Sequence, residues 1–222
     1  MYLPKHFACE DRAALADFLN TYSFGILLSQ TQGELVSSHL AILFDEDLKY
    51  AYGHLAKANP QWKAWQETPS VDLIFHGPHA YISPQDYASP GHVPTWNYAS
   101  VHAKGEIQIF DGVEEKVAVL KRLVEHYESS RDQPWSMSEE LSAANGKINA
   151  IVCFRIKMVG IDFKKKLSQN QSSADRKQVV SNLRTRDGIW DSSVADMMDL
   201  CSIKSSPIEK DGSSPFPRST KR

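Results

Sequence analysis

Apolar and β-branched residues recur along the chain in short segments that polar turns separate, a pattern that predicts β-strands. Turns at residues 31–34 and 45–47 join the first three segments closely, which indicates an antiparallel meander. The predicted strands cover residues 24–30, 35–44, 49–55, 70–76 with a brief continuation at 80–82, 97–110 and 148–160.

Apolar residues at a spacing of three and four predict helices between these strands. The clearest is 114–129, where Val117, Leu120, Val124 and Tyr127 share one side. The other predicted helices cover residues 11–20, 60–66, 138–144 and 174–183. Six or more antiparallel strands with inserted helices favour a β-barrel of the α+β class.

The chain changes character after about Arg184 and becomes rich in Ser, Pro and Lys from residue 202 onward. Such a segment buries too little apolar area to offset the entropy of ordering. We therefore expect one domain at residues 1–186 and a flexible, largely disordered tail at 187–222, with an isolated helical turn at 194–200.

Composition narrows the class of protein. A formal net charge of −2 over 222 residues provides no general attraction to nucleic acid or to an anionic membrane. Cys9, Cys153 and Cys201 are widely spaced and predict reduced thiols. No apolar run approaches ~20 residues, and residues 1–20 lack the pattern of a signal peptide. We therefore expect a cytoplasmic protein without a membrane segment.

The segment 50–65 combines a predicted strand with a helix that starts at Asn59-Pro60, a favoured N-cap followed by a favoured first helical residue. His54, Lys57 and Lys63 flank this junction. Cationic groups beside a helix N-terminus are typical of phosphate sites. The alternative is a turn followed by an amphipathic helix with lysines on its solvated face.

Three further segments complete a set of motifs. They are Met-Tyr-Leu-Pro-Lys-His-Phe at 1–7, Val-Pro-Thr-Trp-Asn-Tyr-Ala-Ser-Val-His at 93–102, and Lys-Leu-Ser-Gln-Asn-Gln at 166–171. With the segment 50–65, they resemble the PaiB family of FMN-binding split-barrel proteins, which are named as negative transcriptional regulators. The resemblance extends from residue 1 to about 183. It implies an antiparallel split β-barrel with peripheral helices.

The resemblance also implies a flavin site without the GxGxxG fingerprint, which this chain lacks. It assigns the FMN phosphate to the turn after the third strand, and the isoalloxazine edge to backbone groups of the second strand. The phosphate residues would be His54, Lys57, Asn59 and Lys63, and the strand residues His39, Leu40, Ala41 and Ile42. For His39, a purely structural role in the sheet is the alternative.

The motif at 96–102 supplies a second candidate surface. Alternation along a strand places Trp96, Tyr98, Ser100 and His102 on one face. Two aromatic rings, a hydroxyl and an imidazole suit a planar ligand. The alternative is an aromatic cross-strand pair within the core.

The segment 164–171 resembles the place where related pyridoxamine-phosphate oxidases reach the flavin from the second subunit. This implies a homodimer with the site at its interface and Lys166, Ser168 and Gln169 as inter-subunit contacts. The family pattern often has Arg where this chain has Gln171, which would weaken any charge contributed there. A basic surface turn is the alternative.

Three functions follow. The first is a homodimeric FMN-binding protein of PaiB type, a transcriptional regulator that would be an FMN-dependent oxidoreductase if it is an enzyme. The second is a haem-binding or haem-degrading split-barrel protein, with His92 or His102 as axial ligand. The third is a ligand-responsive regulator without catalysis. The charge and the lack of a helix-turn-helix argue against direct DNA binding. No metal site is expected, because the spacing of His76, His79, His92 and His102 matches no metal motif.

Overall fold

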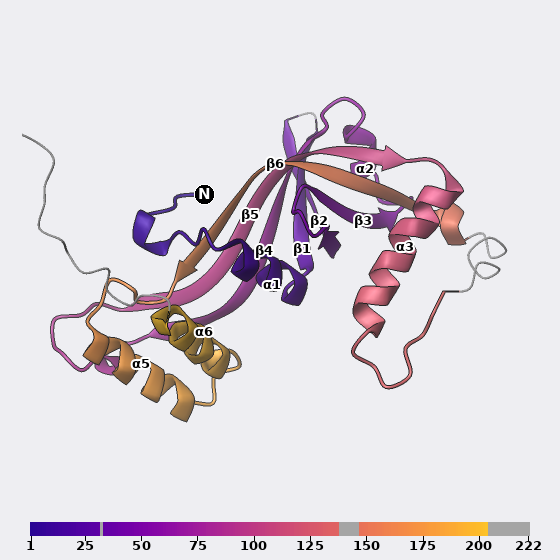
Figure 1. Cartoon of the computed structure of the whole chain (residues 1–222). Coiled ribbons are helices and arrows are strands. Elements are labelled where there is room, and N and C mark those ends of the chain that lie inside the picture. Colours follow the sequence, from indigo (N-terminus) through magenta and orange to yellow (C-terminus); the bar gives the residue numbers. More distant parts are fainter. Residues whose placement is uncertain (32, 138–146, 204–222) are drawn as a thin grey trace, which may run out of the picture.

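The computed structural model describes residues 1–31, 33–137 and 147–203. Its centre is a closed antiparallel barrel with the strand order β1-β2-β3-β6-β5-β4, so the predicted α+β barrel and its opening meander are confirmed (Figure 1). The strands are β1 (Phe24–Thr31), β2 (Glu34–Phe44), β3 (Tyr50–Ala56), β4 (Ser70–Ile82), β5 (Thr95–Phe110) and β6 (Ile151–Lys166).

Alternation along the strands fills the barrel with apolar side chains. The fully buried side chains include Leu27, Ile42, Leu73, Phe75 and Phe154. Only glycine fits at position 53, because a Cβ atom there would lie 2.8 Å from the Phe154 ring and 3.0 Å from the Ala41 carbonyl oxygen. This glycine allows Phe154 to fill the interior beside β3.

The barrel is closed, but its β2–β3 ladder is short, and an opening follows where this ladder ends. Their ladder pairs Ile42–Phe44 with residues 51–53, while the rest of β3 continues along β6. The short helix α2 (Gln61–Ala64) lies next to this opening and packs against β1. The buried Gln61 amide donates to the carbonyl oxygens of Leu27 and Val36 and to Ser29 Oγ.

Two helices cover parts of the barrel. Helix α1 (Arg12–Thr21) begins at Asp11, whose carboxylate accepts the Ala14 N–H, and it buries Phe18 and Leu19 against the barrel core. Helix α3 (Val113–Glu128) buries Val119 and Leu123 in a small cluster with residues of the barrel's outer side. The predicted helix at 138–144 lies outside the described residues.

Two strands differ most from their predicted bounds. Residues 70–76 and 80–82 belong to one strand, β4, with a register shift between His76 and His79. Strand β6 continues to Lys166 rather than ending at residue 160, so the three lysines at 164–166 lie in the strand. The long strands β4, β5 and β6 extend beyond the barrel toward a separate pair of helices (Figure 1).

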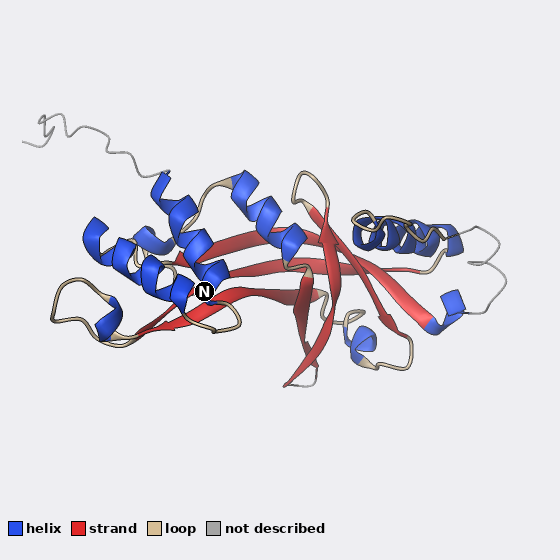
Figure 2. Cartoon of the chain, turned by 90° about the horizontal axis from the view of Figure 1, so that it is seen from below, coloured by secondary structure: helices blue, strands red, loops and turns tan. Residues whose placement is uncertain are grey.

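This pair is α5 (Ser173–Thr185) and α6 (Asp191–Ile203), which share a second apolar core with the ends of β4 and β6. In the view from below, helices lie at both ends of the strands (Figure 2). The second core includes Ala80, Ile82, Tyr87, Leu167, Val179, Leu183, Val194, Ala195 and Met198. Short 3₁₀ helices complete the fold at η1 (Lys5–Phe7), η2 (Pro84–Asp86) and η3 (Lys147–Ala150).

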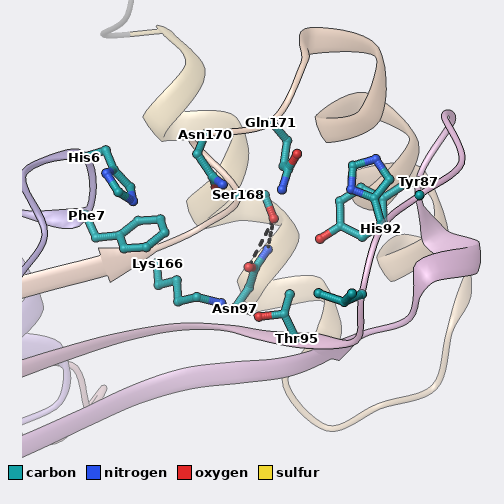
Figure 3. Close-up of a pocket in the computed structure, with 12 residues that line it drawn as sticks. His6, Phe7, Tyr87, His92, Thr95, Asn97, Lys166, Ser168, Asn170 and Gln171 are labelled. Atoms are coloured by element: carbon teal, nitrogen blue, oxygen red, sulfur yellow. Dashed lines mark hydrogen bonds between the residues drawn. The ribbon is translucent and has the colours of Figure 1, made fainter.

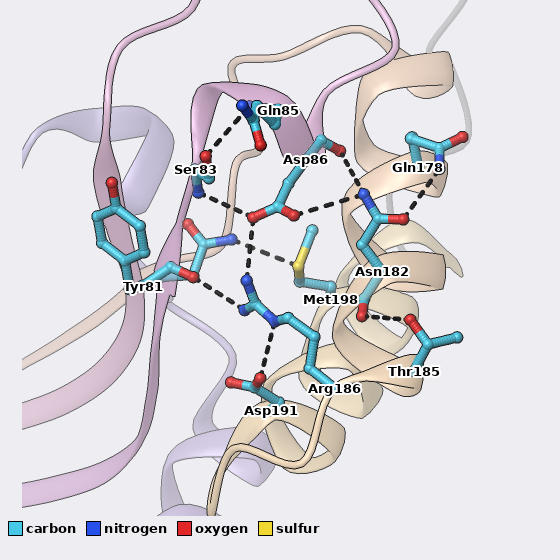
Figure 4. Close-up of polar contacts among 11 residues, drawn as sticks. Tyr81, Ser83, Gln85, Asp86, Gln178, Asn182, Thr185, Arg186, Asp191 and Met198 are labelled. Atoms are coloured by element: carbon cyan, nitrogen blue, oxygen red, sulfur yellow. Dashed lines mark hydrogen bonds and ion pairs between the residues drawn. The ribbon is translucent and has the colours of Figure 1, made fainter.

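The predicted tail therefore needs a correction, because residues 191–203 form a packed helix. Arg186, at the expected end of the domain, instead links the end of β4, η2 and α6 (Figure 4). Its guanidinium donates to Asp86 at 3.1 Å, to Asp191 at 2.9 Å and to the Tyr81 carbonyl oxygen at 2.9 Å. The sequence pattern predicted only an isolated helical turn at 194–200, because the burial of α6 depends on residues of β4 and of the segment after β6 that are distant in sequence. Residues 204–222 lie outside the described part.

Candidate functional site

The end of β3 carries the cationic residues that the resemblance assigns to a phosphate. Lys57 follows the strand directly, and its backbone is fixed by hydrogen bonds to the Ala150 carbonyl oxygen and from the Trp62 indole. The side chains of Lys57 and Lys63 are exposed, and neither has a hydrogen bond or ion pair within the described residues. Both ammonium groups are therefore available to an anion.

The helix that follows contributes less than the sequence suggested. Helix α2 has four residues, and the Asn59 side chain already accepts the Gln61 N–H at 3.0 Å. The Asn59 amide also donates to Ser38 Oγ at 2.8 Å. Asn59 thus joins the turn to β2, and a phosphate here would depend on side-chain cations rather than on a helix dipole.

His54 lies on the outer side of β3, opposite Cys153 of β6. Its Nδ1 is buried and has no hydrogen-bond partner within the described residues. Burial lowers the pKa of His54, because the charged imidazolium loses solvation. An unpartnered buried nitrogen costs free energy, and a ligand acceptor would remove that cost.

The four β2 residues divide between the two sides of the barrel wall. The side chains of Leu40 and Ile42 point into the core and are 7% and 0% exposed, so only their backbone could meet a ligand. His39 and Ala41 alternate with them on the outer side. Ala41 and His54 are the next residues beyond the Ile42–Gly53 pair, where the ladder ends.

The motif on β5 faces outward, as alternation predicted. Trp96 is 52% exposed, and Tyr98 and His102 are half-buried, so an aromatic pair inside the core is excluded. Ser100 belongs to the same side but is buried. Strand pairing places His102 in one outward row with four other residues, namely His39, Ile26, Ile74 and Asp162.

The motif after β6 makes contacts within its own chain. Lys166 Nζ donates to Thr95 Oγ1 and, at 2.7 Å, to the Trp96 carbonyl oxygen. Ser168, at a positive φ of 58°, exchanges hydrogen bonds with Asn97. Gln169 accepts the Leu167 N–H and donates to the Lys165 carbonyl oxygen. An inter-subunit role for Lys166, Ser168 and Gln169 stays a prediction.

Two of these residues, Lys166 and Ser168, line a pocket of about 420 Å³ beside α5 (Figure 3). The 93–102 motif contributes Thr95 and Asn97 to it, from the opposite side of the strand to Trp96 and Tyr98. Sequence reasoning missed Asn97, although the motif contains it, because it weighed only the aromatic face. The remaining lining residues are His6, Phe7, Tyr87, Gly91, His92, Val93, Asn170 and Gln171.

His92 is held by neighbours on two sides. Its ring stacks on Tyr87 with centroids 3.8 Å apart, and its Nε2 lies 3.0 Å from Ser89 Oγ and 3.6 Å from Asp175. Hydrogen bonds from Ser172 and Ser89 lower the pKa of Asp175 to about 2. Within residues 1–31, 33–137 and 147–203, no group of His, Cys, Asp and Glu could hold a metal ion.

Comparison with known proteins identifies relatives of the chain. Residues 1–159 match the family described as "Putative FMN-binding domain". The chain is 34% identical over 204 residues to protease synthase and sporulation protein PAI 2 of Bacillus subtilis, the PaiB protein, covering 90% of this chain and 97% of that protein.

Solved structures with the same fold have much lower identity. The flavocytochrome Anf3 from Azotobacter vinelandii is 13% identical with a TM-score of 0.57, over 84% of this chain and 75% of that one. An FAD- and haem-binding protein from Mycobacterium smegmatis is 14% identical with the same TM-score, over 71% and 72%. The neighbours show a split-barrel fold, and the sequence matches show that the chain belongs to the PaiB-like family of FMN-binding domains.

Proposed function

We propose that the chain binds FMN with its phosphate at the end of β3 and its ring along the outer side of β2. The proposal rests on one observation: three side-chain nitrogens in one short segment lack a hydrogen-bond partner. Lys57, Lys63 and His54 Nδ1 have no partner within the described residues. A phosphate at this turn would accept charge-assisted hydrogen bonds from the two ammonium groups and a further one from the imidazole.

The opening between β2 and β3 supports the place of the ring. The β2–β3 ladder stops at the Ile42–Gly53 pair, so β2 continues past it without β3 beside it. The backbone of His39 and Ala41 is then accessible from the β3 side, and their side chains point outward. These residues would orient the ring, while FMN when bound supplies hydride or electron transfer.

We further propose that two copies form a homodimer through the outer side of the β1–β2 hairpin. Phe24 and Leu35 are 68% and 72% exposed there, with Ile26 and Leu28 half-buried between them. An exposed apolar face of this kind is typical of a protein interface. Because His39 pairs with Ile26 in the same row, such a dimer would bring the flavin strand to the interface.

A regulatory role, if the chain has one, would not require direct contact with DNA. The segment 174–186 has four basic residues, and its three arginines are engaged within the chain, while Lys177 is exposed. Arg184 pairs with Asp196 and Asp199, Arg186 with Asp86 and Asp191, and Arg176 with the Met198 carbonyl oxygen. With the net charge of −2, this favours a regulator that acts through its ligand or a partner protein.

The experiment is a titration of the purified protein with FMN, in which binding is measured by the quenching of flavin fluorescence. We expect saturable binding with one FMN per chain and a dissociation constant in the micromolar range or below. Light scattering on the same sample should report a dimer. Absence of saturable binding would refute the flavin proposal. Within the described residues, no helix is long and apolar enough to span a membrane.

A further inference from the structure

The pocket beside α5 lies away from the proposed flavin site within the same chain. Figure 1 shows α5 and α6 at one end of the long strands, and α2 and α3 at the other end. The pocket volume of about 420 Å³ falls in the range of small-molecule sites, roughly 300 to 1,000 Å³. It is therefore a candidate binding site that the flavin proposal does not use.

Lys166 gives this pocket a positive charge without a counter-ion. Its ammonium donates to Thr95 Oγ1 and to the Trp96 carbonyl oxygen, which are both neutral acceptors. No carboxylate pairs with it in the part of the chain that the structure describes. An ammonium has three N–H donors, so one is left without a hydrogen-bond acceptor, and the ammonium lies 5.9 Å from the centre of the Phe7 ring. Burial also lowers the pKa of Lys166, and a bound anion would offset that cost.

Two other polar side chains of the lining can still donate hydrogen bonds to a ligand. The side-chain amides of Asn170 and Gln171 have no hydrogen-bond partner within the described residues, and both point toward the pocket in Figure 3. None of the lining residues is acidic. The nearby Asp175 is already occupied by hydrogen bonds from Ser172 and Ser89.

Contacts within the chain also fix the shape of the pocket before a ligand binds. Ser168 occupies the left-handed region at φ 58°, which is strained for a residue with a side chain, and the buried Asn97 holds it there through hydrogen bonds of 3.0 and 3.2 Å. Phe7 contributes an apolar wall that is 8% exposed, and Tyr87 is fixed by stacking on His92. Rigid apolar walls around a few polar groups suit a planar organic molecule.

We propose that this pocket binds a small planar organic acid, whose carboxylate lies at Lys166 and accepts hydrogen bonds from the amides of Asn170 and Gln171. The ring of the acid lies against Phe7. The site is separate from the FMN site, so the protein carries two ligands at opposite ends of its strands. A pocket of this kind can report a metabolite to a flavin-binding regulator or receive a substrate.

The test is a calorimetric titration with benzoate, a planar carboxylate, and with benzamide, its neutral isostere. We expect benzoate to bind and benzamide to bind about tenfold more weakly or not at all, because only the carboxylate forms a charge-assisted contact with Lys166. Equal affinities, or no binding of benzoate, would overturn the proposal.

Variants at Lys166 and Gln171, with a control at Lys165, test the role of charge in benzoate binding. Lys166→Met should reduce benzoate affinity about tenfold, while Lys165→Met, outside the lining, should leave it unchanged. Gln171→Glu should weaken binding and Gln171→Arg should strengthen it, since they add opposite charges at one position. The Gln171 pair keeps the test decisive if Lys166→Met does not fold. Failure of the pair to move the affinity in opposite directions would refute the site.

A benzoate titration repeated at saturating FMN tests this inference independently of the flavin proposal. An unchanged benzoate affinity supports two distinct sites. Competitive displacement of benzoate by FMN would assign the pocket to the flavin and overturn the inference, while leaving FMN binding itself intact. If the chain does not bind FMN at all, the benzoate results still decide the inference alone.

Discussion

The amide of Asn59 donates a hydrogen bond of 2.8 Å to Ser38 Oγ, which joins the turn after β3 to the strand β2. The contact spans the opening that remains where the β2–β3 ladder ends. It fixes against the barrel the turn that carries Lys57 and leads into α2, which carries Lys63, so the two lysines have a rigid base although their side chains are exposed. The proposed phosphate site depends on this link.

Removing both cations should weaken FMN binding. We predict that Lys57→Ala combined with Lys63→Ala lowers the affinity several-fold or more, because charge-assisted hydrogen bonds to phosphate are lost. The measurement is the FMN dissociation constant by fluorescence quenching.

A matched control distinguishes the loss of these two lysines from a loss of positive charge elsewhere in the protein. The pair Lys104→Ala and Lys177→Ala removes two exposed lysines from β5 and α5. These changes should leave the affinity near the wild-type value. Equal losses in the two double variants would show that net charge, not the turn after β3, governs the binding.

His54 should respond to the flavin phosphate. In the free protein, burial lowers the pKa of His54 below its usual 6.5, so the folded state loses stability relative to the unfolded chain as the pH falls below that value. We predict that FMN raises this pKa, because a phosphate favours the charged imidazolium. An NMR titration of the His54 ring protons with and without FMN measures the change, and a pKa unaffected by FMN would remove His54 from the site.

The proposed dimer face can be disrupted by charge. Phe24→Glu combined with Leu35→Glu should convert the dimer to a monomer in light scattering, because both side chains are exposed on one apolar face. Val159→Glu changes a similarly exposed residue, 69% accessible, on β6 and should leave the dimer intact. A dimer that survives the double change would place the interface elsewhere.

Arg186 should matter for stability far more than its neighbour. Arg186→Ala leaves Asp86 and Asp191 without their shared partner, and we expect a loss of roughly 2 kcal/mol in the free energy of unfolding. Arg184→Ala breaks exposed pairs with Asp196 and Asp199, for which the expected loss is below about 1 kcal/mol. Urea denaturation compares the two, and similar losses would contradict the linking role of Arg186.

Local patterns were sufficient to predict the barrel strands and the outward face of β5, since alternation and turn residues act over a few positions. They could not predict the packing of α6, because Val194 and Met198 become buried only against Ile82 and Leu167, which are distant in sequence. The pocket was missed because three stretches that are distant in sequence, residues 6–7, 87–97 and 166–171, form it together.

The central claim is tested most directly by the visible spectrum of the purified protein after addition of an equal concentration of FMN and desalting. The account predicts that flavin absorption elutes with the protein at about one FMN per chain, and that the Lys57/Lys63 double variant retains less. Flavin that elutes entirely with the small molecules would contradict it. A Soret band retained in a parallel sample with hemin, without retained flavin, would favour the haem alternative.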